Sequence, residues 1–187
     1  MSRGNNGTPV VYLKAGELHV TDQPSLVITV LGSCLSVTMH SSRLGIGGIC
    51  HGLLPECGKK NSCTRECPDG LRYVDCSIRQ MTGIFDKAGV KRSDIEVKCF
   101  GGADMFPRSI EKPGLISVGR QNIMTAEALL KQEGFAIARQ DVGGLGGRKL
   151  LFYPHTGEVL LQRLEGVREA DVRRKQYGVP RHPAGMR

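Results

Sequence analysis

Two residues in the first third of the chain have the side-chain types and spacing for nucleophilic catalysis. Cys34 ends a glycine-serine turn in the segment TVLGSCLSV, and His51 lies further on in GGICHGLLP. A nucleophilic thiol must be partly exposed, and a histidine within hydrogen-bond reach can take its proton. Backbone N–H groups at Gly32 and Ser33 could then hold an oxyanion. The alternatives are a buried structural cysteine and a histidine satisfied by a backbone carbonyl.

The segments around these two residues are typical of β-strands. Leu26–Leu31 is an apolar, β-branched run, and strand-like composition resumes over Cys34–Met39. After a short turn the chain returns over Ile46–Leu54. Two adjacent antiparallel strands would place Cys34 and His51 side by side, as acid–base chemistry between them requires.

The remaining segments predict more strands and two helices. Apolar residues recur at helical spacing over 74–88 and 122–133, and Gly89 and Gly134 end these patterns. Further strands are expected at Val10–Leu13, Glu17–Val20, Ile95–Phe100, Phe135–Arg139, Leu150–Tyr153 and Val159–Leu164. A turn at 155–157 joins the last two. This order favours an α/β (α+β) fold with a mixed sheet system whose outer faces are covered by helices.

Length and composition indicate one domain in a reducing compartment. The 187 residues suit a single domain, which we expect over 1–165, followed by a basic tail at 166–187. The net charge of +8 suits an acidic partner, but aromatic residues are not interleaved with the basic ones, so a nucleic-acid partner is not expected. No apolar run resembles a signal peptide or a membrane span, which predicts a cytoplasmic protein without membrane insertion.

A cysteine-rich insertion is expected over 56–70 as a polar loop. It contains Cys57, Cys63 and Cys67, and Cys50 and Cys76 lie near it in the sequence. Such a group could bind zinc, but the C-x5-C-x3-C spacing is not a standard zinc motif. The alternative is a variable surface loop with free thiols. We therefore expect no metal and no cofactor.

Glycine clusters recur after the Cys and His segments. They are GGADMF at 101–106, GRQN at 119–122 and DVGGLGGRK at 141–149. None has the spacing of a phosphate loop or a dinucleotide fingerprint, so tight turns that support the site are the simpler interpretation.

Taken in order, TxLGSC, GGICHGLLP, these glycine clusters and TGEVLLQRL resemble the CheD family of chemoreceptor glutamine deamidases over about residues 10–164. The resemblance implies a three-layer α-β-β-α sandwich with mixed sheets, as in bacterial toxin deamidases. It implies protein-glutamine glutaminase activity on chemoreceptors (methyl-accepting chemotaxis proteins) in chemotaxis signalling. Some members are also reported to deesterify methylglutamate. The partners implied are these receptors and a CheC-like phosphatase.

The family's catalytic Cys, His and Thr fall on Cys34, His51 and Thr29. Thr29 would orient His51 through its hydroxyl, as the third member of a triad orients the base. Some members have one more residue between the threonine and LGSC, and a one-residue shift in a strand turns a side chain to the other face. The alternative function is a docking module for a CheC-like phosphatase or for receptors, with little catalysis.

Overall fold

The computed structural model describes residues 2–3, 7–58, 69–105 and 115–164, whose strands form two sheets. Sheet A has the strand order β1 (Ser2–Arg3), β2 (Pro9–Tyr12), β4 (Leu26–Leu31), β9 (Arg148–Tyr153) and β10 (Glu158–Arg163). Sheet B has the order β3 (Leu18–Thr21), β6 (Ile46–Cys50), β5 (Leu35–Ser41), β7 (Glu96–Gly101) and β8 (Ile137–Val142). The pairs β2–β4 and β7–β8 are parallel and their neighbours antiparallel, so the predicted mixed sheets are confirmed.

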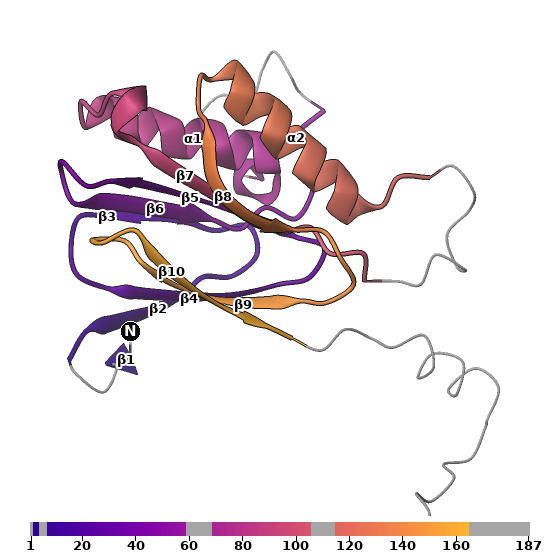
Figure 1. The fold of residues 1–187 in the computed structure, drawn as a ribbon, viewed down its shortest axis with the longest axis horizontal. Helices are drawn as coiled ribbons and strands as arrows, with labels where there is room; N and C mark the ends of the chain where they lie inside the picture. Colours follow the sequence, from indigo (N-terminus) through magenta and orange to yellow (C-terminus); the bar gives the residue numbers. More distant parts are fainter. Residues whose placement is uncertain (1, 4–6, 59–68, 106–114, 165–187) are drawn as a thin grey trace, which may run out of the picture.

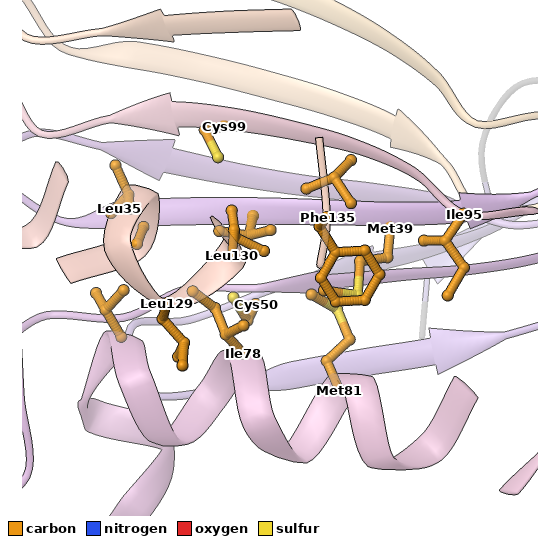
Figure 2. Packing of buried hydrophobic residues seen from close by; sticks show 14 of the residues in the cluster. Leu35, Met39, Cys50, Ile78, Met81, Ile95, Cys99, Leu129, Leu130 and Phe135 are labelled. Carbon is orange, nitrogen blue, oxygen red and sulfur yellow. The ribbon is translucent and has the colours of Figure 1, made fainter. Parts of the chain in front are cut away.

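Both helices cover the same face of sheet B. In Figure 1, α1 (Val74–Lys87) and α2 (Val118–Gln132) lie together on one side of sheet B, and sheet A lies on its other side. Short 3-10 helices, η1 (Gly70–Arg72) and η2 (Arg92–Asp94), precede α1 and β7. Figure 2 shows the shared core, to which the helices and sheet B contribute Leu35, Met39, Ile78, Met81, Leu129 and Leu130. Each such side chain contributes about 1.5–3 kcal/mol by leaving water.

The predicted α+β class is confirmed, but the layers of the described residues follow the order α-β-β rather than α-β-β-α. No helix among these residues covers the outer face of sheet A. The reason is that the apolar faces of α1 and α2 are buried in one core against the same face of sheet B. Neither helix is then left to cover sheet A. The outer face of sheet A keeps an apolar row across its strands, formed by Tyr12, Ile28, Leu151 and Leu160 in register.

Most predicted strands are found within two residues of their expected ends, and two boundaries differ for local reasons. Helix α2 begins four residues before Asn122, because the Ser117 hydroxyl caps it by accepting a hydrogen bond from the Arg120 N–H. Strand β6 ends at Cys50 instead of Leu54. The N–H groups of Leu53 and Leu54 both donate to the carbonyl of Arg72, so this part of the chain joins η1 rather than the sheet.

Strand β5 separates two buried layers because its side chains alternate between the faces of sheet B. Leu35, Val37 and Met39 belong to the helix-side core. Ser36 and Thr38 are also buried, on the face turned toward sheet A. An ion pair links the two sheets, since Arg148 of β9 donates to Asp141 of β8 with Nε 2.9 Å from Oδ1.

Parts of the predicted organisation lie outside the described residues. These are most of the cysteine-rich insertion, with Cys63 and Cys67, and the basic tail at 166–187. No helix in the described part of the chain is long and apolar enough to cross a membrane.

The close approach of the two sheets at Gly47 gives a test of this arrangement. A Cβ at Gly47 would lie 2.2 Å from the carbonyl oxygen of Pro154, in the turn between β9 and β10. We expect Gly47→Ala to lower the free energy of unfolding by about 2–3 kcal/mol, because backbone on both sides would have to shift. Urea unfolding followed by circular dichroism measures this change. Gly58→Ala is the matched control, because no atom of the described residues lies within 4 Å of its added Cβ; an equal loss in both variants would contradict the close approach.

Candidate active site

Cys34 lies at the point where the chain crosses from sheet A to sheet B. Strand β4 of sheet A ends at Leu31, and β5 of sheet B begins at Leu35. The turn between them is held by backbone hydrogen bonds, from Ala103 N–H to the Gly32 carbonyl at 2.9 Å and from Gly102 N–H to the Cys34 carbonyl at 2.8 Å. Cys34 is half-buried and packs against the small cluster of Leu31, Phe100 and Leu150 between the sheets.

The register of β5 and β6 places His51 opposite the start of β5, which directly follows Cys34. Thr38 is paired with Ile49, and the same register continues to a bridge between Leu35 and Gly52. Ser36 therefore opposes His51 on one face of sheet B, and Cys34 lies two residues before Ser36 in the chain. That face is turned toward sheet A, because Ile49, two residues before His51, packs in the core between the sheets.

Thr29 fixes the orientation of the His51 ring from the other sheet. Its Oγ1 lies 2.8 Å from His51 Nδ1 and 2.8 Å from the Leu13 carbonyl oxygen. A carbonyl can only accept, so the single hydroxyl proton of Thr29 goes to Leu13. The hydroxyl must then accept a proton from Nδ1–H of His51. This tautomer leaves a lone pair on Nε2, which is buried and has no partner among the described residues.

The loop between β2 and β3 holds the backbone of His51. The Gly16 N–H donates to the His51 carbonyl at 2.7 Å, and the His51 N–H donates to the Glu17 carbonyl at 3.0 Å. Gly16 adopts a φ of +79°, which favours glycine there. His51 is therefore fixed both by its backbone and by its ring.

Burial keeps both members of the Cys34–His51 pair neutral. It raises the pKa of the Cys34 thiol, and the residue's own backbone N–H opposes this shift. Burial lowers the pKa of His51, against the opposite effects of the Leu13 carbonyl and the Glu17 carboxylate. A thiol and an imidazole, rather than a thiolate and an imidazolium, therefore occupy the resting site at neutral pH.

Backbone N–H groups are available in the turn at Cys34. The N–H groups of Gly32, Ser33 and Cys34 donate to no other residue within the described part of the chain, although the carbonyls of Gly32 and Cys34 are both bonded. Free N–H groups next to a nucleophile are the usual donors to an oxyanion. They belong to the turn where Gly32 and Ser33 were predicted to give backbone support.

The other described cysteines near the core have no access to a substrate. Burial raises the pKa of Cys50 to about 11 and that of Cys99 to about 12, and both thiols belong to the core under the helices. Among the described residues, no three His, Cys, Asp or Glu side chains form a group that could hold a metal ion. Cys50 is thus a core residue, and the zinc hypothesis depends on Cys63 and Cys67 outside the described ranges.

Sequence reasoning missed three contributors to the site. The Leu13 carbonyl has no sequence signal because it is a backbone group. The GRQN cluster was expected only to support the site, yet its Asn122 bonds directly to the turn before Cys34. Asp141 and Arg148 form an ion pair between the sheets. In the sequence, this pair was indicated only by an acidic and a basic residue on either side of the paired glycines.

Comparisons with known proteins give a consistent result. The family described as CheD chemotactic sensory transduction matches residues 53–163. A protein of Geobacter sulfurreducens named "Probable chemoreceptor glutamine deamidase CheD 2" is 47% identical over 87% of this chain and 94% of its own length. Proteins of Oleidesulfovibrio alaskensis and Caulobacter vibrioides with the corresponding CheD name are 41% and 38% identical, over 91% and 88% of this chain and 80% and 83% of their own lengths.

The neutral resting pair predicts how the reactivity of Cys34 depends on pH. Because burial raises the thiol pKa above its ordinary value of 9.0, the thiolate fraction should grow only as the pH rises. We expect the rate of Cys34 alkylation by iodoacetamide to climb steadily between about pH 7 and pH 10. Mass spectrometry of the peptide containing Cys34 measures this rate. A plateau of fast alkylation below neutral pH that His51→Ala removes would instead indicate a thiolate–imidazolium pair.

Proposed function

The chain belongs to the CheD family, and from this premise we propose that it deamidates glutamine side chains of chemoreceptors, with Cys34 as nucleophile and His51 as base. The observation that carries the residue assignment is the pair of hydrogen bonds at Thr29. They direct the proton of His51 to Nδ1 and leave Nε2 as an acceptor that could take the proton of the Cys34 thiol. Thr29 is the positioning residue for this base.

The reaction follows from these groups. Nε2 of His51 takes the thiol proton as Sγ of Cys34 attacks the amide carbon, and the carbonyl oxygen becomes an oxyanion. When the intermediate collapses, the C–N bond breaks and the imidazolium gives its proton to the leaving nitrogen, which departs as ammonia. A water molecule then loses a proton to Nε2 and attacks the thioester. The C–S bond breaks, the imidazolium returns its proton to the Cys34 sulfur, and the new carboxylic acid loses its own proton to solvent to leave a glutamate carboxylate.

The oxyanion would be held by the free N–H groups in the turn from Gly32 to Cys34. Two observations support this role for the N–H groups. They donate to no other residue among the described ones, and they lie next to the reacting sulfur in the chain. Because the resting pair is neutral, charge develops only as the thiol attacks. Fixed N–H dipoles at that point stabilise the transition state more than the ground state.

The proposed substrates are chemoreceptors, as the names of the relatives suggest. The net charge of +8 would steer the protein toward an acidic surface on such a receptor. We also propose a CheC-like phosphatase as partner and the cytoplasm as compartment, which suits a protein that keeps Cys34, Cys50 and Cys99 as thiols.

Deamidation of a receptor fragment tests the proposal. We expect the protein to convert particular glutamines to glutamate in the cytoplasmic domain of a chemoreceptor from the same genome, detected by the mass change of the receptor peptides. Cys34→Ala should abolish the conversion, because no other group can form the thioester. His51→Ala should slow it by at least about 100-fold, the usual contribution of a general base. Receptor binding without conversion by the intact protein would favour the docking module instead.

The role of Thr29 has a separate test. Thr29→Val keeps the shape but removes the hydroxyl, so the proton position on His51 is no longer fixed. We expect kcat to fall about 100-fold, while Thr29→Ser, which keeps the hydroxyl, should retain most of the activity. If Thr29 acts through His51, adding Thr29→Val to His51→Ala should change kcat less than about twofold. Additive losses in the double variant would contradict that role.

A further inference from the structure

Asn122 of α2 joins the turn that carries Cys34 to the segment that follows His51. Its side chain is fully buried, and its Nδ2 lies 2.9 Å from the Ser33 carbonyl oxygen and 3.0 Å from the Leu53 carbonyl oxygen. The last backbone-bonded pair of β5 and the segment after β6 is Leu35 with Gly52. Beyond this pair, the two segments are joined by the side-chain amide of Asn122, which donates to a carbonyl of each, instead of by a direct backbone hydrogen bond.

The orientation of the Asn122 amide follows from its partners. Two carbonyl oxygens can only accept, so both N–H bonds of Nδ2 must point at them. The Oδ1 atom is left buried without a partner among the described residues. A buried acceptor without a partner destabilises the folded chain. Stability alone thus does not account for an amide at this position.

The bond to the Ser33 carbonyl determines where the Cys34 N–H points. The peptide unit is planar and trans, so its C=O and N–H point in opposite directions. Because the Ser33 carbonyl is directed at α2, the N–H of Cys34 is directed away from it. That N–H belongs to the same residue as the reacting sulfur and lies on the side of the turn away from α2.

The three carbonyls of this turn are held in different ways. Those of Gly32 and Cys34 accept from backbone N–H groups of the segment after β7, whereas the Ser33 carbonyl between them accepts from a side chain. Rotation of the Ser33–Cys34 peptide would turn its carbonyl toward the reacting carbon and remove the N–H. Among the described residues, Asn122 is the group bonded to that carbonyl against such a rotation.

We infer that Asn122 is a positioning residue for the oxyanion: by holding the Ser33 carbonyl, it keeps the Cys34 N–H aimed at the oxygen of the tetrahedral intermediate. The inference rests on the proposed function. It assigns Asn122 to oxyanion stabilisation and not to activation of the thiol, which depends on His51 and Thr29.

Two reactions of the same cysteine separate these roles. Deamidation passes through an oxyanion, whereas alkylation by iodoacetamide displaces iodide and forms none. We expect Asn122→Ala to lower kcat for deamidation about 100-fold, as loss of one oxyanion donor does. The KM for the receptor fragment and the alkylation rate of Cys34 should stay within about threefold of wild type, because the thiol is still available. His51→Ala should instead slow both deamidation and alkylation, because it removes the base that takes the thiol proton.

A matched control removes the effect of stability. Leu130→Ala, in the same helix and equally buried, should destabilise the protein while leaving kcat per folded molecule unchanged. If Asn122→Ala does not fold, Asn122→Asp keeps the side-chain size but cannot donate to both carbonyls, and the same loss is expected from it.

The remaining outcomes overturn one idea or the other. Equal losses of deamidation and alkylation in the Asn122 variants would mean that the residue acts on the Cys34–His51 pair. Unchanged deamidation would mean that the Ser33–Cys34 peptide keeps its orientation without the hydrogen bond from Asn122. Either result overturns the inference and leaves the proposed deamidase standing. Wild-type protein that converts no glutamine, although its Cys34 is alkylated normally, would contradict the proposed function itself.

Discussion

The site depends on the single proton of the Thr29 hydroxyl. Because that proton goes to the Leu13 carbonyl, Thr29 Oγ1 can only accept a hydrogen bond from His51. Thr29 belongs to sheet A and His51 follows a strand of sheet B, so this contact defines the relative position of the two sheets at the site. The loop that holds the His51 backbone and the α2 side chain that bonds the turn before Cys34 keep these groups in place.

The two-sheet architecture assigns a different task to each layer. Apolar side chains of α1, α2 and sheet B supply most of the core, and its stability does not involve the reacting groups. The layer between the sheets contains the buried polar side chains Ser36, Thr38 and His51, and Ser36 Oγ and His51 Nε2 have no hydrogen-bond partner among the described residues. Helix α2 serves both purposes, since Leu130 faces the core while Asn122 reaches the turn.

Much of this arrangement could be predicted from the sequence, because alternating and helical patterns are local. The strand at Leu26–Leu31 was predicted with the ends that the structure has, and the antiparallel pairing of the strands that follow Cys34 and precede His51 was also predicted. The placement of both helices on one sheet could not be predicted, since an apolar helix face does not specify which sheet it covers. Backbone partners such as the Leu13 carbonyl also have no signature, because every residue has one.

The crossover at Cys34 has a mechanical consequence. Since the proposed nucleophile lies in the link between two stacked sheets and its proposed base follows a strand of one of them, a change in the separation of the sheets would change the distance between the two groups. Ile49 and Phe152 fill the space between the sheets and thereby act as spacers that determine this separation. A change in the volume of either side chain would therefore alter the geometry of the candidate site as well as the packing of the core.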